Sequence, residues 1–308
     1  MIRIEEISKS FGDNKAVDSI SFEVNTGEIF GFLGPNGAGK STTLNILSTL
    51  LKPDKGRIFI NDQDLQEHKR ACQLQIGVVP QEISLYADLS ALDNVLFWGG
   101  LYGMPKARLK ERAMQALEMV GLADRKKDSI KTYSGGMKRR INLACSILHD
   151  PSILLLDEPT VGVDIQSRNH IFEVIEKLRD DGMTIIYTTH YLDEVERLCD
   201  NIAIIDGGKI KAQGDLETLG KISKIKDVLT VQTDTLSEQV RNAIRDSLPS
   251  CSFSSPATIE LECTNIADDT CRLMDVVRES GVRIQSIDTR KADLESIFLK
   301  LTGKNLRD

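Results

Sequence analysis

The first two thirds of the chain alternate between short apolar runs and segments in which apolar residues recur every three or four positions. Short runs predict β-strands, and the longer repeat predicts amphipathic helices. The run Ile-Leu-Leu-Leu at 153–156 is typical of a strand buried on both faces. We therefore expect an α/β domain over residues 1–215, with a largely parallel sheet covered by helices. The candidate strands cover residues 27–33, 57–60, 76–79, 153–157, 184–188 and 201–206.

Between about residues 82 and 150 the apolar spacing becomes mostly helical. We expect a helical subdomain inserted into the sheet domain. Its candidate helices cover residues 91–102, 106–120 and 136–148.

After residue 215 the pattern changes again and predicts a small α+β domain over residues 216–308. The expected order is β-α-β-β-α-β, which is the ferredoxin-like arrangement, followed by a last helix at 294–301. A length of 308 residues fits two domains. The expected strands are 227–233, 251–253, 258–263 and 283–287, and the expected helices are 237–247 and 266–280.

The composition excludes several classes of protein. A net charge of -7 argues against a nucleic-acid partner, because binding phosphates needs a basic face. Residues 1–7 alternate like a strand and do not resemble a secretory signal, and no apolar stretch has the length of a membrane span. We expect a soluble, intracellular chain whose six scattered cysteines are buried thiols, without disulfides or metal.

A glycine-rich segment lies between the expected strand 27–33 and a helix-like run at 42–51. Glycines at these spacings let backbone N–H groups and a helix N-terminus surround a polyphosphate, while a lysine adds positive charge and a serine faces Mg²⁺. The alternative is an ordinary glycine-rich turn with a solvated lysine, but the full spacing favours a nucleoside triphosphate. This phosphate loop consists of Gly34, Pro35, Asn36, Gly37, Ala38, Gly39, Lys40 and Ser41.

Two further motifs follow. Asp157 and Glu158 end the buried strand, where open α/β sheets bind ligands, so one carboxylate can face Mg²⁺ and the other a water. Alone, such a pair is often a solvated strand end. Before that strand, Ser134-Gly135-Gly136 enters a helix and forms a second anion site, which one nucleotide on one chain does not need.

In this order, the motifs resemble the nucleotide-binding subunit of the ATP-binding cassette (ABC) family over roughly residues 1–215. The resemblance implies a P-loop NTPase fold that binds ATP and Mg²⁺. It implies that ATP contacts the phosphate loop together with Phe11, Thr42, Ser134, Gly135, Gly136 and Asp164.

The same resemblance implies catalytic roles. Glu158 would act as the base, His190 would contact the γ-phosphate, and Gln81 would sense Mg²⁺ and the attacking water. Lys40 would grip the phosphates. The implied metal-site residues are Ser41, Gln81 and Asp157.

Four of these residues have ordinary alternatives when taken singly. Phe11 could pack in a hairpin, Gln81 could be solvated, Asp164 could cap a helix, and His190 could be structural. The chain also departs from the family's usual signature, with Tyr133 in place of leucine and Met137 in place of glutamine. The second change puts a polar role at that position in doubt.

The resemblance implies a homodimer that sandwiches ATP between the phosphate loop of one copy and the Ser134 turn of the other. Since we expect no membrane span, a separate integral permease would receive the motion, so that membrane contact is indirect and the chain lies peripherally on the cytoplasmic face. We expect the contact surface between residues 81 and 98, with Ile83, Leu85, Tyr86, Phe97 and Trp98.

The helix that begins Ser-Gly-Gly-Met-Lys-Arg-Arg, together with the extra C-terminal domain, resembles the drug- and antibiotic-export branch. The alternatives are a soluble ABC ATPase that acts on a macromolecular assembly and the ATPase of an importer. The C-terminal domain could tether the dimer, regulate it or dock on the permease.

Overall fold

The computed structural model describes residues 1–223, 225–263, 265–290 and 293–303. The chain divides into two compact units, one from Met1 to Leu216 and a second that begins at Glu217. Each unit has buried apolar clusters of its own. Within the described ranges, every helix is too short or too polar to cross a membrane.

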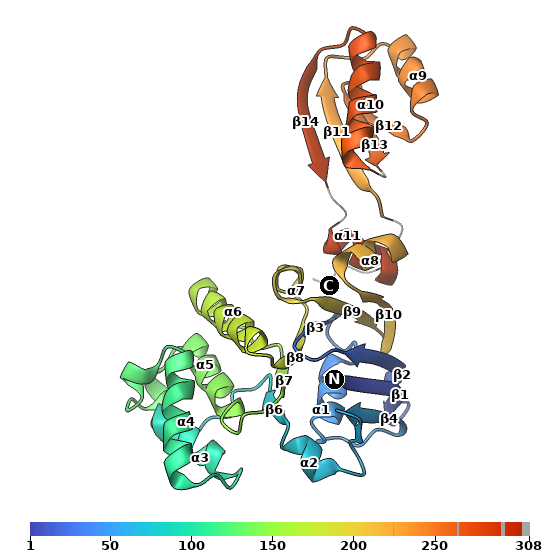
Figure 1. Cartoon of the computed structure of the whole chain (residues 1–308). Coiled ribbons are helices and arrows are strands. Elements are labelled where there is room, and N and C mark those ends of the chain that lie inside the picture. Colours follow the sequence, from blue (N-terminus) through green and yellow to red (C-terminus); the bar gives the residue numbers. More distant parts are fainter. Residues whose placement is uncertain (224, 264, 291–292, 304–308) are drawn as a thin grey trace. The chain divides into compact units, whose positions relative to one another are not determined.

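A six-stranded sheet forms the centre of the first unit, in the order β10-β9-β3-β8-β7-β6 (Figure 1). All neighbouring strands of this sheet pair in parallel except β10, which pairs antiparallel with β9. The predicted strands of this sheet are confirmed, whereas β10 was missed because it is largely polar. The strands are β3 (Ile29–Leu33), β6 (Ile76–Val79), β7 (Ile153–Asp157), β8 (Thr184–Thr189), β9 (Asn201–Asp206) and β10 (Lys209–Gly214).

A second, antiparallel sheet has the order β2-β1-β4-β5. Its long hairpin at the N-terminus turns between Phe11 and Asn14, which are paired residues. Only the start of β1 and most of β4 were expected from the sequence. The strands are β1 (Ile2–Phe11), β2 (Asn14–Val24), β4 (Lys55–Ile60) and β5 (Gln63–Asp64).

Strand β7 separates two apolar clusters, as its continuous apolar run predicted. Leu154 and Leu156 belong to one cluster, and Ile153 and Leu155 belong to the other. Successive side chains of a strand point to opposite faces, so this division places a core on each face of the six-stranded sheet. Helix α1 (Lys40–Leu47) contributes to the second core, and α6 (Ile165–Asp180) contributes to the first.

The three helices expected between residues 82 and 150 are present and pack on one another. Ser90 begins the first of them, because its hydroxyl accepts the N–H of Asp93 at 3.1 Å. They are α3 (Ala91–Gly100), α4 (Lys106–Met119) and α5 (Gly135–Ser146), with short 3-10 turns at Ala123–Arg125 and Ile130–Thr132. The remaining helices of this unit are α2 (Lys69–Gln73) and α7 (Leu192–Leu198).

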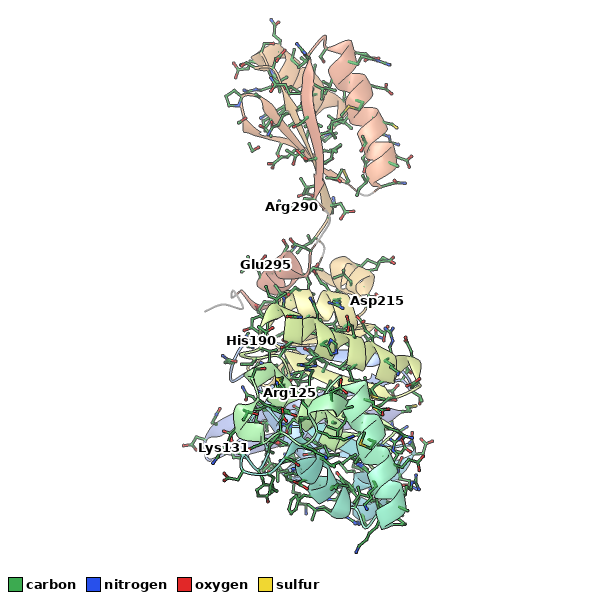
Figure 2. The ribbon with its side chains drawn as sticks, turned by 90° about the vertical axis from the view of Figure 1, so that its left-hand side faces the viewer. Arg125, Lys131, His190, Asp215, Arg290 and Glu295 are labelled. Carbon is green, nitrogen blue, oxygen red and sulfur yellow. The ribbon has the colours of Figure 1, made fainter. Side chains whose placement is uncertain are left out.

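The second unit has an antiparallel sheet in the order β12-β13-β11-β14, and its strands and helices follow one another in the expected order (Figure 1). Side chains of α9 and α10 share one core with alternate residues of the strands. The last strand continues to Arg290, beyond the expected end (Figure 2). The elements are α8 (Leu216–Ser223), β11 (Asp227–Thr233), α9 (Glu238–Ser247), β12 (Cys251–Ser255), β13 (Thr258–Cys263), α10 (Ile266–Glu279), β14 (Ile284–Arg290) and α11 (Leu294–Thr302).

Two of the six cysteines differ from the expectation that they are buried. Cys72, Cys145, Cys251 and Cys263 are buried, whereas Cys199 is partly buried and Cys271 is exposed. On α10 the buried residues are Leu273 and Val277, four positions apart, so Cys271 falls outside that apolar stripe.

Leu154→Ala tests the apolar cluster that contains Leu154 and Leu156, on one face of β7. Leu154 is fully buried, so we expect the free energy of unfolding of this unit to fall by about 3 kcal/mol. The single tryptophan, Trp98, packs against the same cluster, so its fluorescence during urea titration follows this unit. Leu50→Ala, at a side chain that is 74% exposed, should change stability by less than about 0.5 kcal/mol. Equal effects of the two changes would contradict the described core.

Candidate functional site

The phosphate loop connects the end of β3 to the start of α1. Gly39 has a φ of 108°, and a Cβ there would lie 2.5 Å from the carbonyl oxygen of Ala16. A larger residue therefore does not fit at this position. Because the N-cap residue of α1 is Gly39, which has no side chain, the first N–H groups of this helix and the positive end of its dipole are available to an anion.

Lys40 is only 4% exposed and spans the inside of this loop. Its Nζ donates hydrogen bonds to the carbonyl oxygens of Gly34 at 2.7 Å and Pro35 at 3.1 Å. The same nitrogen lies 3.2 Å from Oε1 of Glu158. The ammonium thus lies between the loop and the end of β7.

Asp157 ends β7 and is almost completely buried. Its Oδ1 accepts hydrogen bonds from Ser41 Oγ at 3.1 Å and Thr188 Oγ1 at 2.7 Å. The carboxylate therefore connects the phosphate loop to the neighbouring strand β8, and it places two oxygen atoms, Ser41 Oγ and Asp157 Oδ1, side by side.

Glu158 has a φ of 46°, in the left-handed region that side chains other than glycine rarely adopt. Its N–H donates to the carbonyl oxygen and the hydroxyl of Thr188, at 3.2 and 3.1 Å. Oε1 lies 3.2 Å from Nδ1 of His190, which is labelled in Figure 2, and Oε2 accepts from Nε2 of Gln81 at 3.3 Å. One buried carboxylate is thus in contact with Lys40, Gln81 and His190.

These groups line a cleft of about 590 Å³. Phe11, which the alternative interpretation packed in a hairpin, is 49% exposed and forms part of the cleft wall. No motif in the sequence indicated Asn14, Ala16 or Val161, although a tight hairpin after Phe11 places Asn14 opposite it. The lining residues are Phe11, Asn14, Ala16, Asn36, Gly37, Gly39, Lys40, Ser41, Thr42, Gln81, Glu158, Val161 and His190.

The Ser134 turn lies elsewhere. In the part of the chain that the structure describes, none of Ser134, Gly135, Gly136 and Asp164 lines the cleft. Ser134 is exposed and caps α5, because its Oγ accepts the N–H of Met137 at 3.2 Å. A Cβ on Gly136 would lie 2.3 Å from Cβ of Ser167, so glycine allows the turn to pack closely against α6.

Asp164 lies at the start of the same helix α6. Its Oδ1 accepts the N–H of Ser167 at 2.9 Å, so the capping role foreseen as an alternative is present. The hydrogen bonds from Ser167 lower the pKa of Asp164, so this exposed side chain is charged near neutral pH. The chain thus carries two separate candidate surfaces, the cleft and the exposed region around Ser134 and Asp164.

The two departures from the usual signature both contact Arg125, which is labelled in Figure 2. Tyr133 is buried, its hydroxyl donates to the carbonyl oxygen of Arg125 at 2.7 Å, and the Arg125 guanidinium lies 5.3 Å from the ring centre. Met137 packs against the core, and its sulfur accepts from Nη1 of Arg125 at 3.6 Å. Both side chains therefore anchor the Ser134 turn to Arg125.

Comparison with known proteins agrees with this geometry. The profile of the ABC transporter family matches residues 17–161. Over the full length of both proteins, the chain is 41% identical to the linearmycin resistance ATP-binding protein LnrL of Bacillus subtilis (strain 168). The chain belongs to the ABC transporter family. It is an ATPase subunit that binds ATP.

Other ABC proteins are similar over most or all of the chain. A Nod factor export ATP-binding protein I of Cupriavidus metallidurans is 34% identical, covering 100% of this chain and 99% of that protein. A dimeric post-hydrolysis ATP-binding cassette with bound ADP and phosphate matches with a TM-score of 0.64 and 26% identity. This match covers 70% of the chain and 99% of the cassette.

Replacement of Lys40 tests the phosphate loop of this ABC ATPase. Loss of a buried, charge-assisted hydrogen-bond donor in Lys40→Ala should weaken ATP binding by at least about 10-fold. Isothermal titration calorimetry with the full chain measures this affinity. The matched control is Lys52→Ala, at an exposed lysine outside the cleft, which should bind like the wild type. Undiminished ATP affinity of Lys40→Ala would contradict the site.

Proposed function

We propose that this ABC ATPase powers an exporter and that it works as a homodimer with two shared ATP sites. Export is supported by two relatives, a linearmycin resistance protein and a Nod factor export protein, which match the chain along its whole length. On this proposal the chain lies in the cytoplasm, peripheral to the membrane, where a separate permease forms the path of the exported compound.

The observation that supports the dimer is the separation of the two surfaces that we expect to bind anions. The cleft holds Lys40 and Glu158 but is not lined by the Ser134 turn, which is exposed on the same chain. A triphosphate in the cleft keeps an uncovered side, and the Ser134 turn of a second copy offers N–H groups and a helix N-terminus to it. ATP bound between the copies stabilises the dimer, and hydrolysis releases it.

Mg²⁺ is the expected companion of ATP, and the donor set fits it. Ser41 and Asp157 offer neighbouring oxygen ligands at the end of the phosphate loop, and Gln81 adds an amide at the cleft wall. When bound, the ion would neutralise negative charge on the phosphates. Of the residues here, Ser41 and Asp157 would hold it.

Glu158 is the proposed base that takes a proton from the attacking water. Its contacts with Lys40, Gln81 and His190 hold the carboxylate at the cleft wall. With a triphosphate in the loop, Lys40 donates to the phosphates and His190 contacts the terminal phosphoryl group, while Gln81 orients the water. Phe11 stacks on the adenine ring, because it is the exposed aromatic side chain in the cleft wall.

The proposed permease contact lies between residues 81 and 98. The side chains of Tyr86 and Phe97 are 48% and 41% exposed, and Ile83 is also exposed. The rings of Tyr86 and Phe97 pack edge to face, with their centroids 4.8 Å apart. Leu85 and Trp98, by contrast, pack against the core, so they support this surface from beneath.

A neighbouring hollow of about 250 Å³ includes Trp98, whose buried Nε1 has no hydrogen-bond partner within the described residues. Such an orphan donor is costly unless a partner satisfies it. We infer that a polar group of the permease does so. The hollow is lined by Val78, Pro80, Ser84, Trp98, Tyr102, Asn142, Cys145 and Ser146.

Glu158→Gln tests the catalytic assignment. The amide keeps the size of the side chain but accepts no proton from water, so turnover should fall by at least about 100-fold while ATP affinity stays within about threefold. Steady-state phosphate release and calorimetry measure the two quantities, and size-exclusion chromatography with ATP should show a trapped dimer.

Glu118→Gln, at an exposed glutamate on α4, is the matched control and should hydrolyse ATP normally. Rapid turnover by Glu158→Gln would refute its role as the base.

The double change Tyr86→Ala with Phe97→Ala tests the permease surface. We expect binding to inverted membrane vesicles of the source organism to fall at least about 10-fold, because aromatic anchors dominate such contacts. ATP affinity should not change, since neither residue lines the cleft. Leu50→Ala, also exposed, controls for loss of surface apolar area. Undiminished vesicle binding of the double variant would place the contact elsewhere.

A further inference from the structure

Glu194, in the first turn of α7, is a completely buried carboxylate that does not line the cleft. One cation lies at the limit of ion-pair distance: Nη1 of Arg168 is 4.0 Å from Oε1 of Glu194 and is closer to Oδ2 of Asp193, at 3.1 Å. A carboxylate removed from water is costly unless hydrogen bonds compensate for the lost hydration. The hydrogen-bond partners of Glu194 therefore indicate its role in the structure.

Three hydroxyl groups donate to this carboxylate. Oε1 accepts from Oγ1 of Thr160 at 2.6 Å, and Oε2 accepts from Oγ1 of Thr189 at 2.7 Å and from the hydroxyl of Tyr187 at 2.9 Å. Burial, and then the neighbouring Glu194, raise the pKa of Tyr187, so its hydroxyl stays protonated and donates. Both oxygens of Glu194 are thus satisfied by neutral donors from two different segments.

One of these segments carries His190. Thr189 directly precedes it, and the same Thr189 hydroxyl that donates to Glu194 accepts the N–H of Tyr191 at 3.0 Å. The Thr189 hydroxyl therefore links the residues on both sides of His190 to each other, and it links both of them to the carboxylate of Glu194.

The other segment carries Glu158. Thr160 follows it by two residues, and its backbone carbonyl accepts the N–H of Val163 at 3.1 Å. Since Glu158 has a left-handed backbone conformation, its neighbours must hold the turn in place. Thr188 does so at the N–H of Glu158, and Glu194 does so at the side chain of Thr160.

We propose that Glu194 is a positioning residue for ATP hydrolysis. Its carboxylate ties the turn after Glu158 to the segment before His190, and so maintains the 3.2 Å contact between these two side chains. The proposal rests on the proposed roles of Glu158 and His190. Because small displacements of reacting groups lower turnover steeply, loss of this tie acts on kcat and leaves ATP binding at the phosphate loop unchanged.

The test compares Glu194→Ala, Glu194→Gln and Asp193→Asn in the full chain, by steady-state kcat and KM for ATP. We expect Glu194→Ala to lower kcat about 10-fold or more, with KM within about twofold. Glu194→Gln keeps an acceptor for Thr189 and gains an amide donor for the Thr160 hydroxyl, so it should recover most of the lost turnover. Asp193→Asn changes the exposed neighbour and should behave like the wild type.

Wild-type kcat of Glu194→Ala, or equal changes in kcat and KM, would overturn the proposal. If Glu194→Ala does not fold, Thr189→Val replaces it. This change preserves shape and removes the hydroxyl that donates to Glu194 and accepts the N–H of Tyr191. A kcat equal to that of the wild type would again refute the positioning role. Glu158→Gln belongs in the same series. Fast turnover of Glu158→Gln defeats the proposed function itself, whereas slow Glu158→Gln with a fully active Glu194→Ala defeats only the role of Glu194.

Discussion

The site depends on one ionic contact, between the ammonium of Lys40 and the carboxylate of Glu158, 3.2 Å apart and both nearly excluded from water. Their segments are more than a hundred residues apart in the chain, and the parallel pairing of β3, β8 and β7 brings their carboxyl ends to one edge of the sheet. Attraction between buried charges is strong enough to hold both side chains in place only because the surrounding hydrogen bonds satisfy them. The same carboxylate then orders Gln81 and His190.

The apolar cores on both faces of the sheet make this arrangement rigid. Strand β7 has a core on each side, so it has little freedom to shift. The carboxylates of Asp157 at its end and of Glu158 directly after it are therefore held in fixed positions. Thr188 on the neighbouring strand binds both Asp157 and the backbone of Glu158. Hydrogen-bonded polar side chains therefore lie behind the cleft as well as in its wall, and Glu194 extends this network to α7.

Local sequence patterns were sufficient to predict the elements whose residues follow a regular apolar or glycine spacing. Apolar runs predicted the central strands, and glycine spacing predicted the phosphate loop together with residues that line the cleft. Polar strands such as β10 gave no such signal. Glu194 was also missed, because a glutamate in Leu-Asp-Glu-Val-Glu-Arg looks like an exposed helix residue until β8 and Thr160 are placed around it. Within the expected permease surface, only the fold distinguishes exposed Tyr86 from Leu85, which packs against the core.

The most direct test of the shared site counts nucleotides in mixed dimers built on Glu158→Gln. One copy also carries Lys40→Ala and the other also carries Ser134→Ala, so that a mixed dimer keeps one intact pair of surfaces. If two copies share each ATP, each variant alone stays monomeric with ATP, and their mixture forms dimers that hold one ATP each, measured by light scattering and nucleotide extraction. Dimers with two ATP molecules from either variant alone, or no dimers in the mixture, would contradict the account.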